Sequence, residues 1–205
     1  MAAAHVVTGI RAQAQGDRKF PLAIPATSET APLPALAPSD SPARQALAGE
    51  PVGRLQIPRL RLDVVVFEGT SEATLRKGPG HLAGTAWPAA EDAPAGNCVI
   101  AGHRDSFFRS LRQARQGDLV LLADASGVRR YRLASSRIVR PDEVSVAGPT
   151  DQARLTLITC YPFRWIGAAP LRLVWSAVAE PVEQAAVSSL AVAPPRIPAA
   201  PVQSR

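Results

Sequence analysis

The chain has 205 residues and a formal net charge of +6, from 23 Lys and Arg against 17 Asp and Glu. This length suits one domain with a hydrophobic core and tails. The two cysteines exclude a disulfide framework, and no apolar run approaches the roughly 20 residues of a membrane-spanning helix. Within 51–178, 16 of the 17 cationic residues are arginines scattered over several predicted elements, so nucleic-acid binding is not expected.

Residues 1–50 are predicted to be a disordered Pro/Ala-rich segment, because six prolines interrupt it and no hydrophobic periodicity is sustained. Its first ten residues lack the basic start and long apolar core of a signal peptide. A similar composition predicts a disordered tail over 179–205. Nine of the ten aromatic residues, but only nine of the twenty prolines, lie within 51–178. Since large side chains form cores, we expect 51–178 to be the folded domain.

Short runs rich in Val, Ile and Leu fill this interval and predict an all-β fold. They are bounded by Gly, Pro and Asp, as strands are. The predicted strands are Val52–Ile57, Leu60–Glu68, Asn97–Ala101, Asp118–Ala123, Val128–Val139, Leu155–Cys160 and Leu171–Val178. Several such strands in about 130 residues indicate a barrel or a sandwich.

Two segments between the strands are predicted to be short helices. Ser71–Lys77 begins with a capping residue and ends before a Gly-Pro-Gly turn. Ser106–Arg115 places Phe107, Leu111 and Ala114 on one face and is followed by a glycine.

The two cysteines differ in their surroundings. Cys98 lies within an apolar run and is expected to be a buried core residue. Cys160 ends a strand, where a substrate can reach its thiol. A disulfide between them is not favoured, because it would block that thiol. No metal site is expected, since the cysteines and the three histidines lack the paired spacing of zinc ligands.

Cys160, His103 and Arg172 are the candidate catalytic residues. A single accessible Cys with a His elsewhere is a candidate nucleophile with its base, and Arg172 adds a fixed positive charge twelve residues after the thiol. If the strands ending at Cys160 and beginning near Arg172 pair, strand alternation puts both side chains on one face. His81, in a Gly-rich turn, and Arg164, in a loop, are weaker alternatives.

The segment 161–170 between these two strands is aromatic and punctuated by Gly and Pro. Because it starts at the thiol, it is a candidate wall of a substrate site. Hydrophobic packing at the mouth of a barrel explains its composition equally well.

These residues resemble the signature of the sortases, the cysteine transpeptidases of bacterial envelopes. The signature residues are Thr156–Cys160 (TLITC), Arg172 and, upstream, Gly102–Asp105 (GHRD). The segments Cys160–Phe163 (CYPF) and Gly167–Arg172 (GAAPLR) are similar to the class D branch in particular. Further similarity lies in Leu55–Pro58 (LQIP), Glu68–Thr70 (EGT), Gly78–His81 (GPGH) and Gly84–Thr85 (GT). The resemblance covers about 51–178.

The resemblance implies a closed eight-stranded β-barrel with one or two short helices, acting on a sorting peptide of the Leu-Pro-X-Thr-small type. Cys160 would attack the Thr carbonyl, and His103 would protonate the leaving amine and then deprotonate the incoming one. Arg172 would hold the substrate and stabilise the oxyanion. Thr159 is a further candidate for substrate binding at that anion site. No cofactor is implied.

The implied partners are substrate proteins with a C-terminal sorting motif and an amine acceptor of the cell envelope, with the enzyme a monomer at the extracytoplasmic face. The sequence departs from the family in showing no membrane-anchoring segment before the barrel. Two other functions stay open: a cysteine hydrolase that releases the acyl group to water, and a non-catalytic β-barrel that binds peptides.

Overall fold

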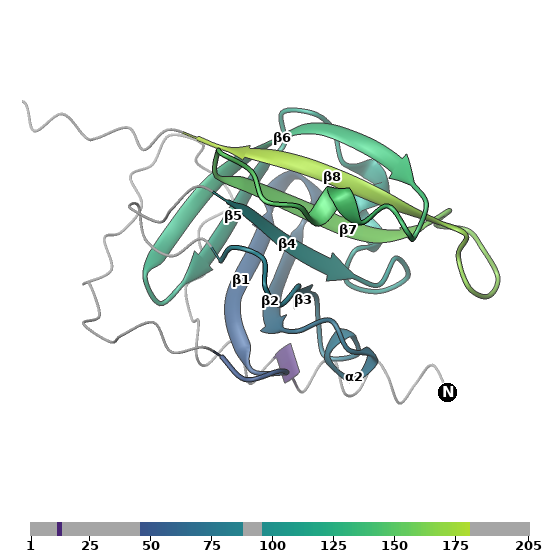
Figure 1. Ribbon diagram of the computed structural model, residues 1–205, viewed down its shortest axis with the longest axis horizontal. Coiled ribbons are helices and arrows are strands. Elements are labelled where there is room, and N and C mark those ends of the chain that lie inside the picture. Colours follow the sequence, from purple (N-terminus) through teal and green to yellow (C-terminus); the bar gives the residue numbers. More distant parts are fainter. Residues whose placement is uncertain (1–11, 14–45, 88–95, 181–205) are drawn as a thin grey trace, which may run out of the picture.

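Eight strands form a closed β-barrel, which confirms the predicted all-β fold (Figure 1). The computed structural model describes residues 12–13, 46–87 and 96–180, so most of the predicted tails lies outside the described residues. The strand order around the barrel is β1-β2-β3-β4-β7-β8-β6-β5, and pairing of β5 with β1 closes it. The pairs β2–β3 and β4–β7 are parallel, and the other neighbours are antiparallel.

The predicted strands agree with the observed ones to within two residues at each end. The observed strands are β1 Pro51–Ile57, β2 Leu62–Glu68, β3 Gly80–His81, β4 Asn97–Gly102, β5 Leu119–Asp124, β6 Gly127–Val139, β7 Arg154–Tyr161 and β8 Leu171–Ala179. The eighth strand, β3, was not predicted, because two residues in a Gly-Pro-Gly turn carry no strand pattern. The strand β2 starts later than predicted because a 3₁₀ turn, η1 (Pro58–Leu60), precedes it.

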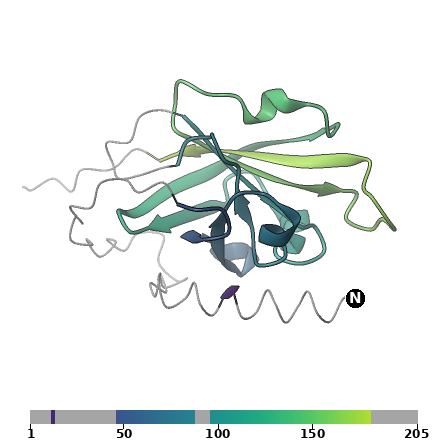
Figure 2. The ribbon, with the colours of Figure 1, turned by 60° about the horizontal axis from the view of Figure 1, so that its bottom comes forward.

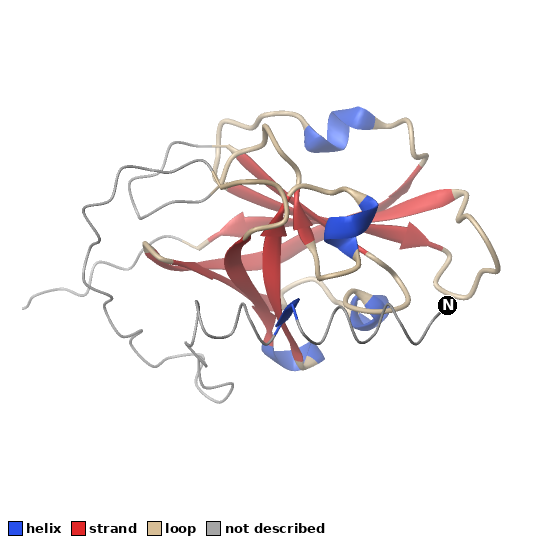
Figure 3. Cartoon of the chain, turned by 90° about the horizontal axis from the view of Figure 1, so that it is seen from below, coloured by secondary structure: helices blue, strands red, loops and turns tan. Residues whose placement is uncertain are grey.

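The short helices lie in the connections between strands (Figure 3). The first predicted helix is α2 (Glu72–Leu75), and the side chain of Ser71 caps it by accepting from the amide of Thr74. The second is a 3₁₀ helix, η2 (Arg109–Gln113), and a further one, η3 (Val144–Ala147), was not predicted. No helix in the described ranges is long and apolar enough to cross a bilayer.

The core-facing side of η2 includes one residue more than predicted. With three residues per turn, Phe108, Leu111 and Ala114 line up, and Phe108 and Leu111 are completely buried in the core. Phe107 is partly buried and packs against the same core. The predicted face of Phe107, Leu111 and Ala114 therefore does meet the core, and the 3₁₀ geometry adds Phe108 to it.

The barrel interior is filled by alternate residues of the strands. Side chains from seven of the strands meet there, among them Leu55, Ile57, Val66, Ile100, Leu122, Leu133, Leu155, Leu157 and Trp175. In β7 the inward residues are Leu155 and Leu157, so Thr156 and Cys160 belong to the outer face. One face of β7, the strand that contains Thr156–Cys160, therefore packs into the barrel, and the other face points outward.

Gln13, in the short described stretch near the N-terminus, contacts the barrel at β2. Its side-chain amide accepts from the Val65 amide at 2.6 Å and donates to the carbonyl oxygens of Val65 and Lys77, both at 3.1 Å. A Cβ at Gly78 would lie 2.4 Å from the Gln13 amide nitrogen, so the absence of a side chain there permits the contact. The Gln13 side chain thus bonds the backbone of β2 at Val65, whereas β3 pairs with β2 only at Phe67 and Glu68.

A buried carboxylate, Asp118, ties η1 to the start of β5. Both of its oxygens accept from Arg59, the second at 2.6 Å, and it also accepts from the Arg115 amide at 2.8 Å. Burial opposes ionisation of Asp118, but these bonds and the charge of Arg59 outweigh it and lower the pKa of the carboxyl.

Replacing Asp118 by asparagine is expected to lower the free energy of unfolding at pH 7 by about 1 kcal/mol, since Arg59 is partly solvated and water screens the pair. A lowered pKa stabilises the folded protein above that pKa and loses its effect as the pH falls through it. The difference between wild type and variant should therefore shrink from pH 7 to pH 3 in urea unfolding. An equal difference at both pH values would contradict the role of the charge.

Candidate active site

The three candidate catalytic residues lie on adjacent strands. Cys160 of β7 and Arg172 of β8 are direct partners in the antiparallel pair. On the other side of β7, Gly102 ends β4 as the parallel partner of Thr159. His103 follows Gly102 by one residue, so the chain leaves β4 beside Cys160. The register therefore places Cys160 and Arg172 side by side and brings the backbone of His103 next to them, from a segment far away in the sequence.

Both cysteines are free, and their environments differ as predicted. Cys98 is 1% exposed in the barrel core, and burial, the main cause, raises the pKa of its thiol far above the usual range. Cys160 is partly exposed on the outer face of β7. Only one of the two thiols is placed to meet a substrate.

The Arg172 guanidinium is held by the loop that leads into β8. Its Nη1 donates to the carbonyl oxygens of Ala169, at 3.1 Å, and Leu171, at 2.9 Å. Among the described residues no carboxylate forms an ion pair with Arg172. Its charge is thus oriented by neutral carbonyls and is not neutralised by them. The alternative, Arg164, is exposed in the loop and has no register partner on β7.

Thr159 lies on the face of β7 opposite to Cys160. Its side chain is 2% exposed, and its hydroxyl donates to the carbonyl oxygen of Gly102 at 2.8 Å. It shares the inner face with Leu157, opposite to the side from which Cys160 is reached. In this structure the Thr159 hydroxyl is therefore engaged by Gly102 and faces away from the Cys160 side. The hydroxyl instead joins β7 to the residue before His103.

Two features that fix the His103 segment carried no signal in the sequence. A Cβ at Gly102 would lie 2.8 Å from the Phe108 ring, so the buried ring packs directly against this backbone. Arg104 donates from Nη2 to the carbonyl oxygens of Trp165, at 2.9 Å, and Gly167, at 3.1 Å. Arg104 thereby ties the segment after β4 to the loop between β7 and β8.

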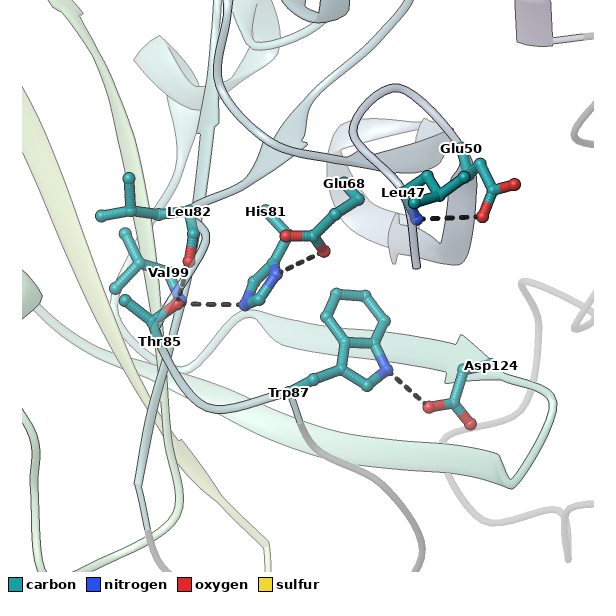
Figure 4. A network of polar contacts seen from close by, with 9 residues as sticks. All are labelled: Leu47, Glu50, Glu68, His81, Leu82, Thr85, Trp87, Val99 and Asp124. Carbon is teal, nitrogen blue, oxygen red and sulfur yellow. Dashed lines mark hydrogen bonds and ion pairs between the residues drawn. The ribbon is translucent and has the colours of Figure 1, made fainter. Parts of the chain in front are cut away.

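His81 lies in a separate polar network (Figure 4). Its Nδ1 lies 2.8 Å from a Glu68 carboxylate oxygen and its Nε2 lies 3.0 Å from the Thr85 hydroxyl. The ring of Trp87 stands edge-on to His81 at 5.1 Å between centroids, and the imidazole is buried. With both nitrogens occupied, His81 has a structural role in holding the segment after β3. In the described ranges, no three His, Cys, Asp or Glu side chains gather as a metal site.

Comparison with known proteins identifies the family of the chain. Residues 55–180 match the family model described as Sortase domain, which is more than half of the chain. The chain belongs to the sortase family. Among curated relatives, sortase D of Bacillus subtilis is 33% identical over 127 residues, which are 62% of this chain and 62% of the relative. This sortase therefore spans less than two thirds of that relative's length, and the match agrees with the predicted class D resemblance.

Solved structures give the same fold. A sortase D5 transpeptidase of Clostridium perfringens has a TM-score of 0.65 at 19% identity, covering 85% of this sortase and 99% of that chain. Sortase C of the same organism, solved with the C-terminal cell wall sorting motif, has a TM-score of 0.58 at 26% identity, covering 65% and 72%. The fold of the barrel is thus that of the solved sortases.

The accessibility of the two thiols leads to a testable difference. Iodoacetamide is expected to modify Cys160 about 100-fold faster than Cys98, since Cys98 can react only after the core opens. Mass spectrometry of peptides from briefly treated native protein measures both rates. In 8 M urea the two rates should become similar, which provides the control. Equal inertness of both thiols in the native protein would contradict an accessible nucleophile.

Proposed function

We propose that this sortase is a cysteine transpeptidase that cleaves a Leu-Pro-X-Thr-small sorting peptide and transfers its acyl part to an amine. The observation that carries the proposal is the register of three adjacent strands, with Cys160 opposite Arg172 and His103 leaving β4 beside them. Acyl transfer needs a nucleophile, a proton donor and a positive charge near the developing oxyanion. Cys160, His103 and Arg172 would supply these three groups.

In the proposed first step, the Cys160 thiolate attacks the Thr carbonyl carbon and forms a tetrahedral oxyanion. The C–N bond of the scissile amide then breaks, and His103 gives its proton to the leaving amine. A thioester on Cys160 remains. In the second step the acceptor amine attacks the thioester, His103 takes the proton from that amine, and the thiolate leaves. One difficult amide exchange is thereby divided into two easier reactions, without a cofactor.

Arg172 is the proposed oxyanion and substrate contact. Two of its N–H groups are engaged by loop carbonyls on its own side, and a guanidinium has five such donors. The others are proposed to bind the substrate carbonyl oxygen as negative charge develops there. Thr159 is proposed to be a positioning residue that holds Gly102, and with it His103, against β7.

The proposed partners are proteins that carry a C-terminal sorting motif and an amine acceptor of the cell envelope. The related sortase C solved with such a motif supports this substrate class. We also propose that the enzyme acts as a monomer at the extracytoplasmic face. In this proposal, 51–178 is the catalytic domain, with linker-like segments on either side.

Incubating the full chain with a Leu-Pro-X-Thr-Gly peptide and triglycine tests the function. The expected product is the amide between the peptide's Thr and triglycine, together with a Cys160 thioester trapped in acid. Free acid as the only product would support the cysteine hydrolase. Unchanged peptide, with no thioester, would support a non-catalytic peptide-binding barrel and contradict the proposal.

A further inference from the structure

The outer face of β7 is buried at one end and open at the other. Thr156 and its neighbour on β4, Asn97, are 1% and 3% exposed, although both belong to the outer face. Two and four residues further along β7, Ile158 and Cys160 are partly exposed. The segment 140–153, which joins β6 to β7 and contains η3, lies over this sheet (Figure 2). Burial of the outer face thus ends before Cys160 is reached.

Asn97 holds this segment through every polar group of its side chain. Its Nδ2 donates to the carbonyl oxygens of Val146 and Gly148, at 3.1 and 3.0 Å. Its Oδ1 accepts from the Thr156 hydroxyl at 2.7 Å. A buried amide with both N–H groups and its oxygen engaged fixes its partners strongly, since each lost bond leaves an unpaired polar group away from water.

The two ends of the held segment lie at opposite ends of the sheet. It leaves β6 at Val139, which is the partner of Arg172, and so begins beside the candidate active site. It then reaches Asn97 at the start of β4 and enters β7 at Arg154, the partner of Asn97. The Asn97 contact therefore holds the segment at the part that lies far from Cys160.

We propose that Asn97 and Thr156 are positioning residues for the sorting peptide: they set the height of the segment 140–153 above β7. A peptide that approaches Cys160 along the outer face of β7 passes beneath this segment. The proposal rests on the proposed transpeptidase function. Thr156 is the first residue of the TLITC signature, and the proposed reaction steps at Cys160 do not use it. The proposal gives Thr156 a role.

Thr156→Val, which removes the hydroxyl and keeps the shape, tests the proposal, with Thr156→Ser as the matched control. Thr156→Val is expected to raise the peptide KM about tenfold, with kcat within about twofold, because substrate binding is impaired and the reacting groups are not. Amide hydrogen exchange over residues 144–148 should accelerate about tenfold. Thr156→Ser should restore both values. Asn97→Asp, which replaces the donor to two carbonyls by an acceptor, should raise KM and exchange further, about 100-fold.

Three results would overturn the proposal. Unchanged exchange over 144–148 in Thr156→Val would show that the hydroxyl does not hold the segment. Faster exchange with an unchanged KM would show that the position of the segment does not matter to the peptide. A fall in kcat with an unchanged KM would also contradict a positioning role in binding. A wild-type protein that forms no thioester contradicts the transpeptidase function itself, whereas the exchange measurement still decides whether the segment is held.

Discussion

Replacing Cys160 by alanine is expected to abolish both peptide cleavage and amide formation, with a loss of at least about 10⁵-fold in kcat/KM. The variant has no nucleophile, so no thioester can form, while the fold is unaffected because the Cys160 side chain lies partly exposed on the outer face. Chromatography of peptide and triglycine products measures the loss. Acid-trapped thioester should be absent from the variant.

Cys98→Ala is the matched control, because it removes the other thiol of the described residues by the same substitution. Cys98 lies in the core, so this variant is expected to lose some stability and to keep its activity. Retained turnover in Cys160→Ala, or a comparable loss of kcat in a folded Cys98→Ala, would contradict the assignment of Cys160 as the nucleophile.

The strands could be predicted because their signal is local. Alternating or continuous apolar residues between Gly, Pro and Asp define seven of the eight strands. The eighth, Gly80–His81, is too short for such a pattern and exists because Phe67 and Ala101 on either side pair with Gly80. The 3₁₀ form of η2 was missed for a similar reason: the full burial of Phe108 comes from its packing against Gly102 and has no local sequence pattern.

The reactive residues of the site could be predicted, but not the strand pairing and the hydrogen bonds that position them. Cys160 and Arg172 are close in sequence, and strand alternation places them on one face. The parallel pairing of β4 with β7, which brings His103 to them, joins segments about 57 residues apart and has no local signature. The same is true of Asn97 and Arg104, because a single polar residue acquires its role only through the carbonyls that the fold presents to it.

Arg172→Ala is expected to lower kcat/KM about 10³-fold, since it removes the one cation that pairs in register with Cys160. Arg172→Lys keeps the charge but has no planar fork, so it cannot both bond the carbonyl oxygens of Ala169 and Leu171 and present donors to a substrate. We therefore expect kcat/KM of Arg172→Lys to be only about tenfold higher than that of Arg172→Ala. The rate of Cys160 alkylation should change little, because the thiol itself is untouched.

Arg164→Ala is the control for the loss of a positive charge near the site. Arg164 is exposed in the loop between β7 and β8, so its replacement should change kcat/KM by less than about threefold. If Arg164→Ala costs as much activity as Arg172→Ala, the effect comes from the charge of the loop as a whole. If instead Arg172→Ala loses activity, Arg164→Ala does not, and Arg172→Lys is partly active, the result supports a cation that the register between β7 and β8 places where the oxyanion forms.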